Sequence, residues 1–100
     1  MSLATFTEKV EKIVAKNNLI KDKTIKFAFD EGGVVFIDTR NQPNTISHED
    51  QPADCVIQMN LKNGLDLLDG KLNVVTAFMF GNIKVKGDIG IAQKIAQLVG

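Results

Sequence analysis

The chain has 100 residues, the size of one small domain, which leaves no room for a second hydrophobic core. Twelve basic and twelve acidic side chains give a formal net charge of zero, so no overall field attracts the chain to nucleic acid or to anionic lipid headgroups. A single cysteine excludes an intramolecular disulfide, and no secretory signal or membrane span is recognisable, so we expect a soluble, cytoplasmic protein.

An amphipathic helix is the first predicted element. Thr5 and Glu8 have the spacing of a capping box, in which two side chains satisfy backbone N–H groups at the start of a helix. We expect the helix to end near Asn17–Asn18. Apolar residues recur at helical spacing along one side of it, at Phe6, Val10, Ile13 and Val14. This pattern predicts a helix that packs one face on a core.

Two strands joined by a tight turn are predicted next. Ile25, Phe27 and Phe29 alternate with polar or small residues, which is the two-residue period of a half-buried strand. Gly32-Gly33 provides a turn, and the mostly apolar residues 34–39 return as a second strand. The two segments therefore predict a β-hairpin.

Two further strands and a helix follow the hairpin. Residues 45–48 predict a short strand, and residues 55–59 alternate as a longer one does. Asn60 is placed to cap a helix, because its side chain can accept a hydrogen bond from a backbone N–H group. The helix has apolar residues about one turn apart, at Leu61, Leu65 and Leu68. We expect this face to be buried.

A second short helix carries more large apolar side chains than one small core needs. Gly70 can end the preceding helix with a left-handed backbone, and Asn73 can cap the next one over residues 74–80. Successive helical residues point about 100° apart, so Phe78, Met79 and Phe80 cannot share one buried face. At least one of them needs a second apolar partner. That partner is another layer of the protein, a subunit, a membrane surface or an apolar ligand.

The last predicted elements are a strand over residues 83–86 and a helix from Asp88 through Val99. Lys84 and Lys86 are expected to face solvent. In the helix, apolar side chains cover an arc of roughly 160°, wider than the stripe of about 100° that packs on one core. They are Ile91, Ala92, Ile95, Ala96, Leu98 and Val99. Apolar neighbours are therefore expected on both sides of this arc.

The order of these elements, α-β-β-β-β-α-α-β-α, indicates the fold class. Strands and helices that do not alternate regularly favour a mostly antiparallel sheet with helices packed on one face. We predict a single α+β domain over residues 1–100 with five strands.

Residues suited to catalysis or metal binding are scarce. His48 is the only imidazole and lies in a polar segment, and Cys55 begins an apolar strand, where a free thiol is usually buried. One histidine and one cysteine do not make a zinc site, and the acidic residues lack the spacing of a calcium loop. We therefore expect no enzymatic activity and no metal or other cofactor.

The C-terminal half carries a family resemblance. The segment LLDGKLNVVTAFMFGNIKVKGDIG, residues 67–90, resembles without a gap the signature of the sterol carrier protein type 2 family, and residues 53–59 are similar to the strand before it. Three residues depart from the family pattern. Val74 replaces a frequent proline, Phe80 a frequent polar residue and Phe36 a frequent tryptophan. The first two changes make the segment more apolar.

The resemblance implies a tunnel, enclosed by the last two helices and the sheet, for a fatty acyl chain, an acyl-CoA or a sterol. We expect non-enzymatic binding or transfer of a long-chain fatty acid, an acyl-CoA or another apolar lipid. The expected lining consists of Leu65, Leu68, Phe78, Met79, Phe80, Ile91, Ile95 and Leu98. Two alternatives stay open, namely an accessory module that seats a partner enzyme of lipid or quinone metabolism, and a homodimer formed through the same apolar face. Neither nucleic acid binding nor stable membrane insertion is expected.

Overall fold

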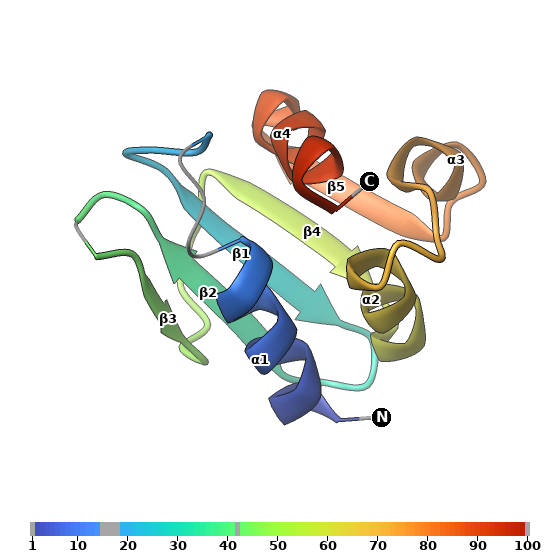
Figure 1. The fold of residues 1–100 in the computed structure, drawn as a ribbon, viewed down its shortest axis with the longest axis horizontal. Helices are drawn as coiled ribbons and strands as arrows, with labels where there is room; N and C mark the ends of the chain where they lie inside the picture. Colours follow the sequence, from blue (N-terminus) through green and yellow to red (C-terminus); the bar gives the residue numbers. More distant parts are fainter. Residues whose placement is uncertain (1, 15–18, 42, 100) are drawn as a thin grey trace.

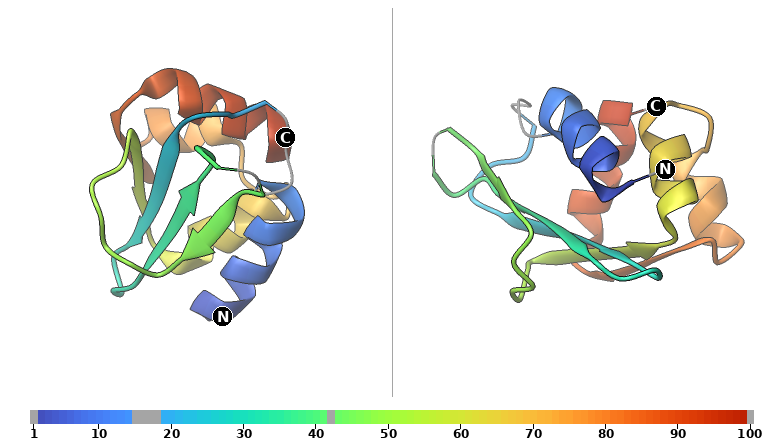
Figure 2. Two further views of the ribbon diagram at one scale, coloured as in Figure 1. Left: turned by 90° about the vertical axis from the view of Figure 1, so that its left-hand side faces the viewer. Right: turned by 90° about the horizontal axis from the view of Figure 1, so that it is seen from below.

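One sheet with helices on a single face forms the structure, a computed structural model that describes residues 2–14, 19–41 and 43–99 (Figures 1 and 2). The strands are β1 (Thr24–Phe29), β2 (Val34–Asp38), β3 (Thr45–Ser47), β4 (Cys55–Met59) and β5 (Ile83–Gly87). The helices are α1 (Leu3–Ile13), α2 (Leu61–Leu68), α3 (Val74–Met79) and α4 (Ile89–Val99). The predicted order of elements is confirmed.

The five strands lie in the order β3-β2-β1-β4-β5. β1 pairs in parallel with β4, while the β1–β2, β2–β3 and β4–β5 pairs are antiparallel. The predicted α+β class with a mostly antiparallel sheet is therefore confirmed. Because β3 and β4 flank β2 and β1, the chain between them crosses the face of the sheet that the helices leave open (Figure 2). A contact of 2.8 Å between Lys26 Nζ on β1 and Asp50 Oδ1 ties this crossing segment to the sheet.

The core lies between the helices and the inner face of the sheet. Alternate residues of the strands point toward the helices, as the two-residue period of a strand requires. Phe6 of α1 packs edge-to-face on Phe27 and Phe29 of β1, with ring centroids 5.2 and 4.8 Å apart. These rings join the N-terminal helix to the central strand of the sheet.

The start of α1 corrects one prediction. The helix begins at Leu3, and Ser2 is the N-cap, since its hydroxyl accepts a hydrogen bond of 3.1 Å from the Thr5 backbone N–H. The predicted capping box at Thr5 and Glu8 is wrong, because Ser2 offers the same hydroxyl cap three residues earlier and adds helical residues that pack on the core. The predicted end near Asn17–Asn18 lies outside the described residues.

The predicted caps of α2 and α3 are confirmed, although α3 ends at Met79, one residue before the predicted end. Asn60 Oδ1 accepts from the Asn63 backbone N–H at 2.7 Å, and Asn73 Oδ1 accepts from the Thr76 N–H at 3.0 Å. Gly70 follows α2 with a φ of 75°, a value that favours glycine because a side chain would be strained there. Local side-chain chemistry therefore sets the ends of both short helices.

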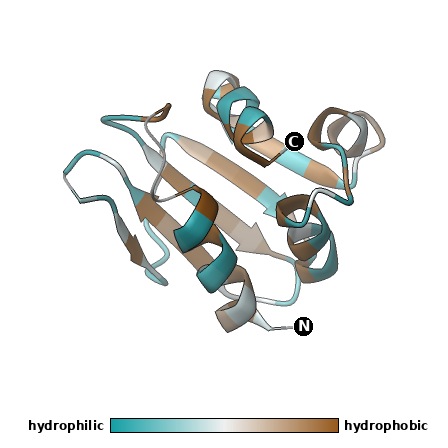
Figure 3. Cartoon of the chain, in the orientation of Figure 1, coloured by the Kyte–Doolittle hydropathy of each residue, from teal (hydrophilic) through white to brown (hydrophobic). Residues whose placement is uncertain are grey.

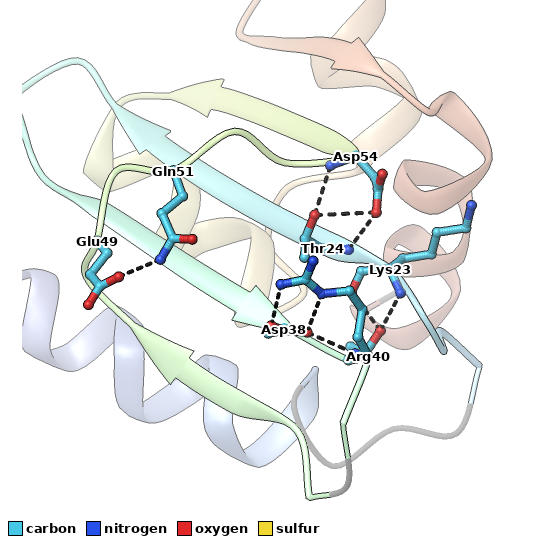
Figure 4. A network of polar contacts seen from close by, with 8 residues as sticks. Lys23, Thr24, Asp38, Arg40, Glu49, Gln51 and Asp54 are labelled. Carbon is cyan, nitrogen blue, oxygen red and sulfur yellow. Dashed lines mark hydrogen bonds and ion pairs between the residues drawn. The ribbon is translucent and has the colours of Figure 1, made fainter.

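A set of polar contacts holds the starts of β1 and β4 together (Figure 4). The Thr24 backbone N–H donates to Asp54 Oδ2 at 2.9 Å, and the Asp54 N–H donates to Thr24 Oγ1 at 2.9 Å. Nearby, hydrogen bonds from the Arg40 side chain and backbone lower the pKa of the Asp38 carboxyl. The reciprocal pair at Thr24 and Asp54 fixes the register of the one parallel pairing in the sheet.

Candidate functional site

An apolar groove lies between α3, β5 and α4, at the end of the molecule opposite β3 (Figure 1). Its volume is about 180 Å³. The lining consists of Val74, Val75, Phe78, Val85, Ile89, Ala92, Gln93 and Ala96. Gln93 is the one polar side chain among these residues, and none of them titrates.

Each wall of the groove follows from the period of its element. Val74 and Phe78 stand about one turn apart on α3, and Ala92 and Ala96 stand one turn apart on α4, so each pair shares a helix face. Val85 points inward from β5, between the outward Lys84 and Lys86. The two alanines leave open the space that larger side chains on α4 would fill.

The turn after α3 connects two walls of the groove, α3 and β5. Gly81 has a φ of 76°, and the Asn82 backbone N–H donates to the Ala77 carbonyl at 2.8 Å, which ends the helix and directs the chain into β5. α3 therefore packs on the strand that follows it. Ala77 is its one buried residue.

The broad apolar arc of α4 has two apolar neighbours. Ile91 and Ile95 are buried in the core, with exposed fractions of 3% and 1%. Ala92, which is also buried in the core, and the partly buried Ala96 lie on the next strip of the helix and line the groove. One helix therefore separates a filled interior from an open apolar space.

The structure places the predicted site residues in three environments. Phe78 lines the groove and is 46% exposed. Met79 and Phe80 are 76% and 77% exposed and stand outside the groove. Four are buried in the core, and Leu98 is partly buried against it; the four are Leu65, Leu68, Ile91 and Ile95.

Sequence reasoning missed most of the groove lining, because three valines and two alanines form much of it, whereas the expected lining consisted of larger side chains. The missed residues are Val74, Val75, Val85, Ile89, Ala92, Gln93 and Ala96. A signal was present for Ala92 and Ala96, which belong to the wide arc of α4. Their small size marks them as residues that leave space.

The groove offers apolar contact and contains no group suited to acid, base or nucleophilic chemistry. Cys55 lies in the core, where burial raises the pKa of its thiol to about 11, so the nucleophilic thiolate is disfavoured at neutral pH. His48 is exposed, with its Nε2 3.0 Å from Thr7 Oγ1 on α1.

Within the described ranges, no cluster of three or more metal-ligating side chains occurs. Likewise, no described helix has the length and hydropathy needed to cross a bilayer.

Comparison with known sequences adds a family. A family profile described as the SCP-2 sterol transfer family matches residues 5–100. The hydroxysteroid dehydrogenase-like protein 2 of Rattus norvegicus is 32% identical over 72 residues, which are 70% of this chain and 14% of that protein. The chain thus spans a small part of the curated relatives that it matches.

Solved structures share the fold. The sterol carrier protein domain 2 of Helicoverpa armigera superposes with a TM-score of 0.72 at 23% identity, covering 95% of this chain and 80% of that one. The ubiquinone synthesis protein UbiJ-SCP2 superposes with a TM-score of 0.74 at 14% identity, covering 96% of this chain and 90% of that one.

Proposed function

Because the chain belongs to the SCP-2 sterol transfer family, we propose that it binds an apolar lipid in the groove between α3, β5 and α4. The ligand is a long-chain fatty acid, an acyl-CoA or a sterol-like molecule, and the role is binding or transfer without catalysis. The observation that carries the proposal is a groove whose lining is apolar except for Gln93. An apolar chain placed there removes its own surface and that of Phe78 from water.

The volume of the groove sets how a long chain would fit. A cavity of about 150 Å³ holds benzene, so 180 Å³ accommodates only one end of an acyl chain. Burying about six CH₂ groups yields roughly 5 kcal/mol, which is no more than the lower part of the association cost of about 4–15 kcal/mol. Tight binding therefore requires the groove to enlarge.

α3 is the element that we expect to move. It has six residues, Ala77 is its one buried side chain, and the N-cap Asn73 and the turn at Gly81 flank it. Its displacement would open a path toward Ile91 and Ile95, which lie behind Ala92 on the core side of α4. These two residues, with Leu65 and Leu68, are the proposed deeper contacts of a fully inserted chain.

The polar end of the ligand has few partners inside the groove. Gln93 is uncharged and exposed, so it can hydrogen-bond a carbonyl or a hydroxyl at the mouth. A carboxylate has no cation among the lining residues, and leaving it in apolar surroundings is costly. We therefore place any charged headgroup at the mouth, in water.

Competition against a fluorescent fatty acid tests the proposal. Acids of roughly 8 to 18 carbons should displace the probe with rising affinity, because each added CH₂ contributes about 0.8 kcal/mol until the groove is filled. A sterol tested in parallel identifies which lipid class fits. Absence of displacement by any acid or sterol would refute lipid binding in the groove.

The exposed apolar side chains of α3 support a second candidate, a protein interface. Either a partner enzyme or a second copy of the chain would cover Met79 and Phe80, which are mostly exposed. UbiJ-SCP2, which shares the fold, is described as a ubiquinone synthesis protein. Native mass spectrometry distinguishes the candidates, because a lipid complex, a homodimer and an empty monomer differ in mass.

A further inference from the structure

β5 has a free edge. It is the last strand in the order β3-β2-β1-β4-β5, so β4 pairs with one side of it and no described strand pairs with the other (Figure 1). Ile83 is 2% exposed, whereas both lysines of the strand and Gly87 are exposed. The open part of the edge therefore runs from Lys84 to Gly87, and it includes Val85 of the groove lining.

The hydrogen-bond register shows which backbone groups of β5 face that edge. Asp88 donates its backbone N–H to the Asp54 carbonyl at 2.9 Å, and hydrogen-bonded pairs alternate with non-hydrogen-bonded pairs along an antiparallel ladder. Two residues back along β5, Lys86 and Val56 are therefore the next hydrogen-bonded pair. The N–H and C=O groups of Val85 consequently face the free edge. Backbone groups presented in this way are a template for another strand.

The side chains along this edge carry one sign of charge. Lys84 and Lys86 project from the face of the sheet opposite the helices, and Figure 3 shows hydrophilic residues alternating with apolar ones along β5. The ion pairs of the described residues involve neither lysine. On the same face of the sheet, Lys26 already contacts Asp50 at 2.8 Å. β5 thus presents two positive charges, without an ion-pair partner among the described residues, beside unpaired backbone groups.

The acidic side chains next to the paired ends of β4 and β5 are engaged by other groups. Asp88 Oδ1 accepts from the Gly90 backbone N–H at 3.0 Å, and Asp88 Oδ2 lies 3.9 Å from Lys23 Nζ. Asp54 Oδ2 accepts from the Thr24 backbone N–H at 2.9 Å. Neither carboxylate pairs with the lysines of β5, so these lysines are open to an acidic partner.

We propose that the free edge of β5 binds an extended segment of a partner protein, in which one apolar residue stands between two acidic residues. The segment adds a strand antiparallel to β5, and its apolar residue exchanges both backbone hydrogen bonds with Val85. In this register the acidic residues lie opposite Lys84 and Lys86, at the positions where paired side chains approach most closely. The apolar side chain points to the helix side of the sheet, toward the groove.

The lysines make the edge selective. Opposite charges directly across an antiparallel strand pair raise affinity by up to about fivefold for each pair, and like charges lower it. Lysines on an edge strand also discourage unspecific pairing of strands. The same two side chains therefore reject neutral or basic strands and favour an acidic one.

Other pairings fit the structure less well. Antiparallel pairing of two copies centred on Val85 would set Lys84 of each copy opposite Lys86 of the other, and like charges in that position destabilise a strand pair. The other edge strand, β3, has three residues, Thr45–Ser47, and carries no charged side chain. The edge of β5 thus combines open backbone groups with a charge that selects its partner.

Fluorescence anisotropy with a short labelled peptide tests the proposal. The probe has glutamate–leucine–glutamate at its centre, flanked by serine and threonine. The ligand-free protein should bind this glutamate peptide and should bind a lysine peptide, in which lysine replaces both glutamates, at least about tenfold more weakly. Methylation of the leucine backbone nitrogen should also weaken binding at least about tenfold, because it removes the donor to the Val85 carbonyl at unchanged charge.

Charge reversal tests the location of the site. Lys84→Glu/Lys86→Glu should exchange the preference, so that the lysine peptide binds and the glutamate peptide does not. Lys12→Glu/Lys21→Glu makes the same change in net charge at exposed lysines outside β5, and it should bind the glutamate peptide as the parent chain does. Thermal melts verify that both variants are folded.

Hydrogen exchange at the Val85 amide tests the strand pairing itself. The glutamate peptide should slow this exchange, because it gives the Val85 N–H an acceptor. Absence of binding, equal affinity for the two peptides, equal losses in the two double variants or unaltered exchange at Val85 would each overturn the proposal. So would slow exchange in the peptide-free protein that speeds up on dilution, which would identify a second copy as the occupant. Because no lipid is added, failure of peptide binding is distinguishable from failure of fatty-acid binding.

Discussion

Adjacent residues of α4 have different surroundings. Ile95 is 1% exposed and packs in the core, whereas Ala96 is partly buried and lines the groove. A helix turns about 100° per residue, which is enough to take one side chain from a filled interior to an open space. At the scale of the residue, a substitution of Ile95 should therefore change the free energy of unfolding, whereas a substitution of Ala96 should change the affinity for a ligand.

Two substitutions test this difference between Ile95 and Ala96. Ala96→Phe fills the groove and should weaken fatty-acid affinity at least tenfold with a change in unfolding free energy below about 1.5 kcal/mol, because the ring has space to occupy. Ile95→Ala removes packed methyl and methylene groups and should cost about 2–5 kcal/mol. Urea melts and fatty-acid titrations measure the two quantities separately.

Gln97→Phe is the matched control for Ala96→Phe, since Gln97 is exposed on α4 and does not line the groove. It should leave fatty-acid affinity unchanged. Unaltered affinity in Ala96→Phe would show that ligand binds elsewhere.

At the scale of the element, the junction between β5 and α4 depends on one close backbone approach. Gly87 pairs with Cys55 at the start of β4 and has a φ of 90°. A Cβ added at this position would clash with the Asp54 carbonyl oxygen, a backbone atom that β4 holds in place. The next residue, Asp88, donates its backbone N–H to that same carbonyl at 2.9 Å. Glycine at this position thus lets β5 pair fully before α4 begins.

Gly87→Ala should therefore destabilise the fold by roughly 2–4 kcal/mol, from backbone strain and steric overlap together. Gly32→Ala is the control. Gly32 has a comparable φ of 99° but no atom near the position of an added Cβ, so only strain of about 1 kcal/mol applies. Urea unfolding of both variants gives the comparison, and equal costs would contradict the role of the Asp54 carbonyl.

At the scale of the whole molecule, burial of one titratable group links folding to alkaline pH. The pKa of the Cys55 thiol is raised to about 11, first by desolvation and next by the charge of Asp88. Unfolding exposes the thiol and returns its pKa to about 8.5. The unfolded chain then binds fewer protons than the folded chain between these two values, so stability falls as pH rises through this range.

The expected loss from Cys55 is up to about 3 kcal/mol between pH 8.5 and pH 11, and none below pH 8. Urea unfolding at a series of pH values measures it. The variant Cys55→Ala retains every other titrating group, so the difference between the two pH profiles isolates the thiol. Parallel profiles would mean that the thiol ionises equally in the folded and unfolded chains.

The sequence by itself determined much of the secondary structure and the fold class. Asn60, Asn73 and Gly70 mark the ends of α2 and α3 through contacts within three or four residues, which a sequence pattern contains. Alternation in β1 and β4 likewise predicts which side chains face the helices. The family signature over residues 67–90 is likewise a pattern of residues that lie close together in the sequence.

Only the tertiary structure decided which apolar residues line the groove. Ile91 and Ala92 belong to one apolar arc in the sequence and both are buried in the core, yet only Ala92 also lines the groove. The exposure of Met79 and Phe80 was likewise not predictable from the sequence, since helical spacing does not say which face of a helix is covered. The physical reason is that periodicity determines the direction in which a side chain points. Burial depends on what β5, α3 and the core place opposite that side chain, and those neighbours come from distant parts of the chain.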